Sequence, residues 1–137
     1  MKVELKRVDK NFHFEASGVS NVKVNIDGAE SIGGSNSGAR PMELILMGLG
    51  GCSAIDILSI LRKQKIEPTS FEIEINAVRR EKIPSIFTKI EVVYKVTGEV
   101  DESKLKRAID LSVEKYCSVS EILNKTADIT YTYEISK

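Results

Sequence analysis

The chain has 137 residues, of which 42% are hydrophobic and 29% charged, and its 20 basic residues balance its 20 acidic residues. This length fits one domain with one hydrophobic core, so we expect a single domain over residues 1–137. A net charge of zero offers no basic surface for nucleic acid, and no stretch of about 18 uninterrupted apolar residues suggests a membrane span. Residues 1–7 are charged and carry no signal-peptide core, so we expect a cytoplasmic protein with neither nucleic-acid nor membrane partners.

Residues 1–27 contain three short runs in which apolar and polar residues alternate. The apolar positions of these runs are Val3 and Leu5, Phe12 and Phe14, and Val22, Val24 and Ile26. A period of two is typical of half-buried strands, so the pattern predicts an antiparallel meander of three strands. Residues 28–40 are rich in Gly, Ser and Asn, which predicts a mobile loop.

Residues 42–64 predict one long helix, with Pro41 in its first turn, where the missing N–H of proline costs no hydrogen bond. The segment is apolar on nearly every side over most of its length. A helix of this kind is buried on all sides, either in a core or in a subunit interface. Gly48, Gly50 and Gly51 each weaken the helix by roughly 1 kcal/mol relative to Ala, which the close approach of another backbone would offset.

The second half of the chain predicts two more strands followed by a helix. Residues 71–78 and 87–96 alternate between apolar and polar, and the turn around Pro84 joins them into a hairpin. Asp101 is a good N-cap for a helix over residues 102–117.

The last segments predict a short helix and a closing strand. Ser118 and Glu121 have the spacing of a capping box, which predicts that the helix starts at Ser118. Residues 129–135 alternate and predict the strand. The order of elements, with strands grouped between helices, favours an α+β fold over a doubly wound parallel sheet.

Cys52 and Cys117 are the candidate reactive residues. Cys52 lies in the most apolar stretch of the chain, and Cys117 lies between two predicted helices, where a helix N-terminus favours thiolate. Taken alone, either cysteine is more often an inert core residue. Asp56 follows Cys52 by four positions on the same helical face, and we interpret it as structural because a buried acid would oppose ionisation of the thiol. With His13 as the single histidine, the chain has too few ligands for a closed four-ligand zinc site, so we expect no metal.

Four motifs carry a resemblance to a known family. They are Arg40–Leu44, Gly50–Asp56, Arg79–Glu81 and Glu114–Ser120. Together with the order of the elements, these motifs resemble the OsmC/Ohr family of thiol peroxidases over essentially the whole chain, and in particular its YhfA-like branch. The resemblance implies an OsmC-like α+β fold and an intertwined homodimer with two active sites at the subunit interface. It also implies reduction of small organic hydroperoxides as part of a stress response.

By position, the resemblance makes Cys52 the peroxidatic thiol and Cys117 the resolving thiol. Cys52 would attack the peroxide as thiolate and become a sulfenic acid, which Cys117 would condense to a disulfide. An external thiol, for which a dithiol is one candidate, would reduce the disulfide, and no other cofactor is implied. Ser118 stands where the organic hydroperoxide branch has proline directly after its second cysteine.

The resemblance also implies a glutamate and an arginine at the site. Glu43 matches the glutamate, and Arg40 is the arginine nearest the motif, with Arg79 and Arg80 as alternatives. In one straight helix, nine residues would separate Glu43 from Cys52 by about 13.5 Å and place them on opposite faces. Either the helix breaks near its glycines or the glutamate comes from the partner chain, and we favour the partner.

Two other functions stay open for these residues. Cys52 could be the nucleophile of an acyl-thioester hydrolase, although His13 is far away in sequence and no other base is evident. The chain could instead form a noncatalytic dimer that binds an apolar ligand at its seam.

Overall fold

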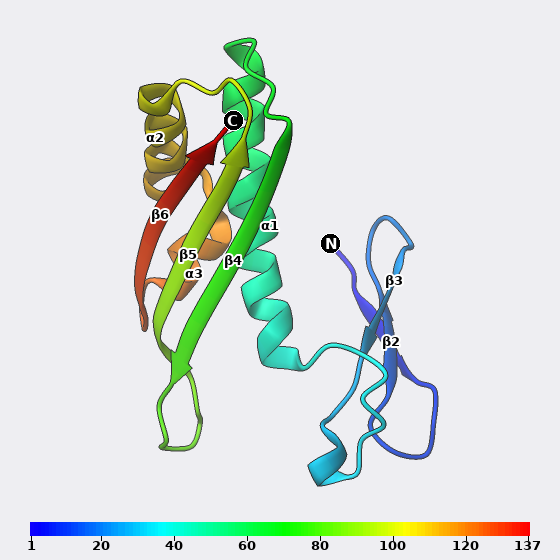
Figure 1. Ribbon diagram of the computed structural model, residues 1–137. Coiled ribbons are helices and arrows are strands. Elements are labelled where there is room, and N and C mark those ends of the chain that lie inside the picture. Colours follow the sequence, from blue (N-terminus) through cyan, green and yellow to red (C-terminus); the bar gives the residue numbers. More distant parts are fainter. The chain divides into compact units, whose positions relative to one another are not determined.

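The structure is a computed structural model that describes all 137 residues, and the chain divides into two compact units, Met1–Met47 and Gly48–Lys137. Each unit contains one three-stranded sheet, and the long helix α1 (Pro41–Lys63) runs through the boundary between them (Figure 1). The α+β prediction is therefore confirmed.

The first unit contains the predicted antiparallel meander. Its strands are β1 (Glu4–Arg7), β2 (Phe14–Ser17) and β3 (Lys23–Ile26), in the order β1-β2-β3. Each strand pairs antiparallel with its neighbour, as in the cross-strand pair Phe14 and Ile26. The period-two pattern of residues 1–27 therefore predicted this sheet correctly.

The segment over residues 28–40 is more ordered than the mobile loop that its composition predicts. It contains a 3-10 turn, η1 (Glu30–Ile32), and is arranged around the buried carboxylate of Asp27. That carboxylate accepts hydrogen bonds from the backbone N–H groups of Gly28 (2.7 Å), Ser35 (3.1 Å) and Ser37 (3.0 Å). The Asp27 carboxylate therefore satisfies backbone N–H groups that have no partner in a helix or a strand.

Helix α1 is continuous from Pro41 to Lys63, so the break near Gly48 considered above does not occur. The helix is apolar all round, yet it is buried on one side only. Leu49, Ile57 and Leu61 are fully buried, whereas the side chain of Ile55 is 69% exposed. Burial of the remaining side of the helix in a subunit interface stays a prediction.

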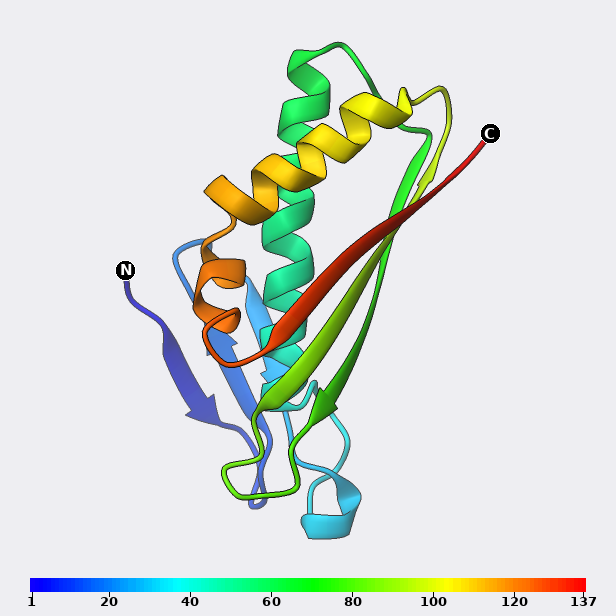
Figure 2. The same cartoon turned by 90° about the vertical axis from the view of Figure 1, so that its left-hand side faces the viewer.

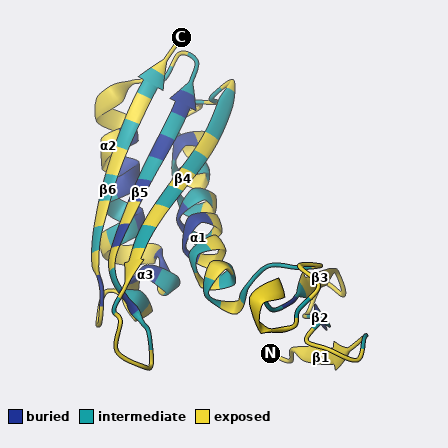
Figure 3. Cartoon of the chain, turned by 60° about the horizontal axis from the view of Figure 1, so that its bottom comes forward, coloured by how far each residue is buried: buried dark blue, intermediate teal, exposed yellow.

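The exposed side of α1 forms a narrow face of small and apolar residues. It comprises Met47, Gly48, Gly51, Ile55 and Ser59, and Figure 3 shows exposed positions recurring along the helix. Helix α1 is long and apolar enough to cross a membrane. Core helices of soluble proteins meet the same criterion of length and composition.

The second unit contains the predicted hairpin and closing strand. Strands β4 (Ser70–Arg79) and β5 (Phe87–Thr97) pair antiparallel, and β6 (Asp128–Ser136) lies parallel to β5 at the other edge. Parallel pairing requires a crossover, which the helices between β5 and β6 supply. Helix α2 (Glu102–Leu111) is the first of them, and its Asp101 N-cap accepts the N–H of Lys104 at 3.0 Å as predicted.

One face of this second sheet is covered by helices (Figures 1 and 2). Its central strand β5 places four fully buried side chains on that face: Ile90, Val92, Tyr94 and Val96. The core of the second unit lies between this face and the buried residues of α1 and α2, such as Leu61 and Leu105. The core positions the part of α1 that carries Cys52.

The predicted helix over residues 102–117 ends early, at Leu111, and a π-helical turn, η2 (Ser112–Tyr116), follows it. The last helix, α3, spans Ser118–Leu123. Its N-cap is Cys117 rather than Ser118, because the Cys117 sulfur accepts the N–H of Ser120. The predicted capping box does not form, since the Glu121 carboxylate pairs with Lys125 at 2.8 Å instead.

Candidate thiol site

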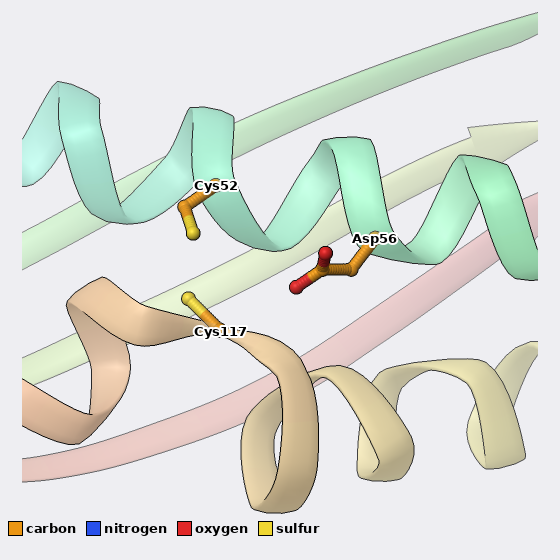
Figure 4. Close-up of side chains that lie close together, drawn as sticks. All are labelled: Cys52, Asp56 and Cys117. Atoms are coloured by element: carbon orange, nitrogen blue, oxygen red, sulfur yellow. The ribbon is translucent and has the colours of Figure 1, made fainter.

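The two cysteines lie next to one another in the second unit. Their sulfur atoms, together with a carboxylate oxygen of Asp56, all lie within 4.8 Å of one another. Cys52 and Asp56 come from α1, and Cys117 comes from the junction between η2 and α3, as Figure 4 shows. Both cysteines are free thiols, with Cys117 buried and Cys52 partly buried.

Two features of local structure bring these side chains together. Cys52 and Asp56 are four residues apart on a helix, so they lie on one face one turn apart. On the opposite side, the N–H of Cys117 donates to the carbonyl of Ser112 at 2.7 Å, which closes a π-helical turn. Such π-turns occur frequently at functional sites, and this one ends α2 so that the Cys117 sulfur points toward α1.

Ser112 links the turn before Cys117 to helix α1, which carries Cys52 and Asp56. Its buried hydroxyl donates to the Asp56 carboxylate at 3.1 Å and lies 3.5 Å from the backbone oxygen of Ser53. Next to it, the hydroxyl of Tyr94 donates to Ser53 Oγ at 2.7 Å, and Ser53 Oγ donates to the carbonyl of Gly50 at 3.2 Å. These hydrogen bonds satisfy the buried polar groups next to the thiols and help to fix the segments that carry them.

Two tyrosines of the sheet, Tyr94 and Tyr131, connect the sheet to α3. The hydroxyls of Tyr131 and Ser120 share a hydrogen bond of 2.8 Å. The rings of Tyr94 and Tyr131 stack, with their centroids 6.4 Å apart. Since Ser120 also donates its N–H to the sulfur of Cys117 at 3.4 Å, these tyrosines help fix the position of that thiol.

Burial dominates the ionisation of Cys117. It raises the pKa of the Cys117 thiol to about 11, because thiolate loses its hydration there. The N–H of Ser120 at the helix N-terminus opposes this rise, and the neighbouring Cys52 adds to it. The N–H groups of Ser120 and Val119 at the helix N-terminus lower the pKa of Cys117 as expected, but burial raises it by more.

Arg40 and Glu43 lie in the first unit, at the start of α1. The Glu43 carboxylate accepts the backbone N–H of Arg40 at 3.0 Å, which satisfies a free donor at the helix N-terminus. The Arg40 guanidinium donates to the carbonyl of Gly38 at 3.3 Å. These contacts are local, and the two side chains do not form the bidentate pair that would hold the arginine on the carboxylate.

The alternative arginines are engaged in the loop between β4 and β5. Arg79 donates to the carbonyl of Ser85, and Arg80 donates to the carbonyl of Pro84, each at 2.7 Å. Within residues 48–137 no arginine donates a hydrogen bond to either cysteine sulfur. His13, the one histidine, shares a hydrogen bond of 3.0 Å with Asn25 in the first unit.

The sequence analysis interpreted Asp56 as structural and did not predict the hydrogen bond that Asp56 accepts from Ser112. The spacing of Asp56 from Cys52 was a visible signal, because four residues along a helix bring side chains to one face. Ser112 carried no such signal, since its contact with Asp56 spans 56 positions of the chain. A surface hollow lies beside Cys117 and is lined by residues 113–118, Glu121 and Ile122.

Comparisons with known proteins show the family and the fold. Residues 34–132 match the family model described as OsmC-like protein. Protein YhfA of Escherichia coli K12 is 45% identical over 104 residues, which cover 73% of this chain and 78% of that protein. A hypothetical protein from Aquifex aeolicus VF5, whose crystal structure is known, is 31% identical with a TM-score of 0.86, over 99% of this chain and 96% of that one.

A more distant structure shares the fold. The organic hydroperoxide resistance protein OsmC from Legionella pneumophila superimposes with a TM-score of 0.69 at 16% identity, over 97% of this chain and 95% of that one. This likeness concerns the fold alone, whereas the family match and the more identical relatives extend to sequence. The chain belongs to the OsmC-like protein family.

Proposed function

We propose that the protein is a thiol peroxidase that reduces organic hydroperoxides, with Cys52 as the peroxidatic thiol and Cys117 as the resolving thiol. The observation that carries this proposal is the approach of the two sulfur atoms to within 4.8 Å, from segments 65 positions apart in the chain. Two free thiols at this distance can form a disulfide with only small side-chain movements.

The reaction takes place in three balanced steps. The Cys52 thiolate attacks one peroxide oxygen, the O–O bond breaks, and an alcohol leaves once its alkoxide takes up a proton, while Cys52 becomes a sulfenic acid. The Cys117 sulfur then attacks the Cys52 sulfur and expels the hydroxyl as water, which forms the disulfide. Two external thiols, or one dithiol, restore the reduced cysteines and become a disulfide themselves. We place these steps in the cytoplasm, where such thiols are kept reduced.

The proposed active form is a homodimer. Within residues 48–137 no arginine reaches the thiols, and the face of α1 comprising Met47, Gly48, Gly51, Ile55 and Ser59 is open to solvent. A second subunit that covered this face would bury its apolar surface and exclude water from Cys52. We propose that it also brings Arg40 and Glu43 to the partner's Cys52, where the guanidinium would favour thiolate and stabilise the departing alkoxide.

The substrate that we propose is a small organic hydroperoxide. Cys52 lies in the most apolar stretch of the chain, and such a surround suits an alkyl or aryl hydroperoxide better than hydrogen peroxide. The relative from Legionella pneumophila is called an organic hydroperoxide resistance protein. Comparison of rates for an aryl alkyl hydroperoxide and for hydrogen peroxide tests this preference, and equal rates would contradict it.

Intact-mass measurement tests the roles of the two cysteines. One equivalent of aryl alkyl hydroperoxide is added to the reduced protein, to Cys52→Ser and to Cys117→Ser. We expect the wild type to lose two hydrogens, Cys117→Ser to gain one oxygen and Cys52→Ser to stay unmodified. No change in any of the three would contradict the proposal and favour an apolar-ligand-binding dimer, while thioester hydrolysis that survives in Cys117→Ser without reductant would favour a hydrolase.

A further inference from the structure

We propose that the reduced protein binds a thiophilic divalent cation of the zinc class through three ligands, the sulfur atoms of Cys52 and Cys117 and the carboxylate of Asp56. A cation held there would keep both thiols from reacting until it is removed. The binding and its effect on thiol reactivity are independent of the peroxidase activity, and only the bearing of that effect on peroxide reduction rests on the function proposed above.

The donor atoms are already close to the spacing that such a cation requires. All three lie within 4.8 Å of one another, on α1 and at the start of α3 (Figure 4). Tetrahedral zinc, with bonds of about 2.0–2.3 Å, spaces its ligand atoms by roughly 3.3–3.8 Å. A closure of the order of 1 Å lies within reach of side-chain rotation, and two thiolates with one carboxylate select zinc-like ions over magnesium or calcium.

The charges around the three donors also favour a cation. Asp56 forms no salt bridge. On the neighbouring helices, Lys106 pairs with Asp110 and Lys125 pairs with Glu121 instead. Asp56 is partly buried and the adjoining Cys117 is only 4% exposed. Within residues 48–137 no lysine or arginine pairs with the Asp56 carboxylate, so an anionic ligand lies beside the two thiols without a cationic partner.

Neighbouring hydrogen bonds orient the proposed ligands. Ser112 Oγ donates to the Asp56 carboxylate at 3.1 Å and so orients it. The N–H of Ser120 donates to the Cys117 sulfur at 3.4 Å, an arrangement that stabilises a metal-bound thiolate. Such partners hold metal ligands in place in known sites.

Three protein ligands make this site different from the closed zinc site that the residue count excluded. A closed site needs four protein ligands, whereas three ligands leave the fourth position to water. Binding releases one proton from each thiol. A disulfide between Cys52 and Cys117 has no thiolate to offer, so the cation and the disulfide exclude each other.

Cobalt(II) serves as a spectroscopic probe for the binding. The protein is reduced, freed of reductant and metal, and titrated with Co²⁺ under nitrogen, and then with Zn²⁺. We expect one Co²⁺ per chain with thiolate-to-cobalt charge-transfer absorption, which Zn²⁺ abolishes. Protein oxidised beforehand to the Cys52–Cys117 disulfide is expected to show no such absorption.

Variants identify the ligands. Asp56→Asn removes the charge but not the shape, and we expect it to weaken cobalt binding at least about tenfold, as do Cys52→Ser and Cys117→Ser. Asp110→Asn, a matched change of an exposed aspartate on α2, is expected to leave binding unchanged. Thermal unfolding of each variant shows that it is folded. Absence of thiolate–cobalt absorption in the folded wild type, or unaltered binding by folded Asp56→Asn, would overturn the proposal.

The effect on thiol chemistry is measured separately. One equivalent of Zn²⁺ is expected to slow the reaction of the reduced thiols with a thiol-directed reagent at least about tenfold, and a chelator restores the original rate. This readout uses no hydroperoxide, so an inactive peroxidase does not disturb it. Equal rates with and without bound Zn²⁺ would overturn the protective role.

Discussion

The hydroxyl of Ser112 donates a hydrogen bond to the carboxylate of Asp56 across 3.1 Å, and this bond connects the turn before Cys117 to the helix that carries Cys52. Together with the longer contact of the same hydroxyl to the backbone oxygen of Ser53 at 3.5 Å, it joins the two cysteine-bearing segments directly. The distance between the two thiols therefore depends on a serine and an aspartate that are not themselves redox-active.

Removal of this hydrogen bond is expected to loosen the site. Ser112→Ala leaves a carboxylate oxygen without its partner and should lower the free energy of unfolding by roughly 1–3 kcal/mol. It should also slow disulfide formation after Cys52 is oxidised, because η2 is less firmly held. Chemical denaturation and time-resolved intact mass measure the two effects. Ser118→Ala, at an exposed position, is the control, and equal behaviour of both variants would contradict this role for Ser112.

The rate of disulfide closure is expected to rise with pH. Burial raises the pKa of Cys117 to about 11, so the thiolate fraction grows nearly tenfold per pH unit below that value. If the thiolate is the attacking species, closure after oxidation of Cys52 should accelerate nearly tenfold per unit between about pH 7 and pH 10. Rapid-mix acid quench with mass detection gives the rate, and Cys117→Ser provides the baseline. A flat profile would show that the neutral thiol reacts with its proton removed by another group.

The same pKa predicts how stability changes in alkali. The folded pKa of Cys117 lies above the ordinary thiol value of 9.0, so the folded state holds its proton more tightly than the unfolded state. The contribution to stability is complete below that ordinary value and is lost as pH rises toward 11. Cys117→Ala should therefore show a smaller loss of stability than wild type over this range in denaturation experiments.

The open face of α1 should mediate dimer formation. Ile55 is 69% exposed on this face, and Ile55→Glu would place a charge in the proposed interface. We expect the wild type to sediment at about twice the chain mass of 15.2 kDa and Ile55→Glu to sediment as a monomer without peroxidase activity. Val19→Glu, in the turn between β2 and β3, is the control because Val19 is also highly exposed. A monomeric, fully active wild type would contradict the dimer.

Asp27 is expected to stabilise the segment between β3 and α1 only while it is charged. Hydrogen bonds from backbone N–H groups, that of Ser37 foremost, hold the pKa of Asp27 below its usual value. A lowered carboxyl pKa gives stability that is present above the unfolded pKa and is lost as pH falls through the folded pKa. Asp27→Asn should therefore lower the melting temperature at pH 7 and differ less from wild type near pH 3. Asp128→Asn, at an exposed position, should have little effect at either pH.

Local patterns in the sequence predicted most of the elements. Alternation of apolar and polar residues identified β1 to β6, and Asp101 predicted the start of α2 because an N-cap acts on its nearest neighbours. The resemblance carried by the cysteine motifs predicted the family, which the comparisons confirm. That residues 1–137 act as one domain, and that Arg40 and Glu43 serve the thiols, stay predictions.

The errors arose partly from side chains a few positions away along the chain and partly from burial. The start of α3 depends on the sulfur of Cys117 rather than on the hydroxyl of Ser118, and burial against the sheet sets the pKa of that thiol. The order in residues 28–40 depends on the carboxylate of Asp27, whose backbone partners the composition does not reveal.

By itself the sequence determined the strands, the helices and the two candidate thiols, because apolar periodicity and helix caps act over a few residues. Only the tertiary structure decided that Cys52, Asp56 and Cys117 converge, since their approach needs the parallel crossover from β5 to β6 and the π-helical turn before Cys117. The physical reason is that the energy of such a cluster comes from burial and hydrogen bonds between segments far apart in the chain, which no local pattern encodes.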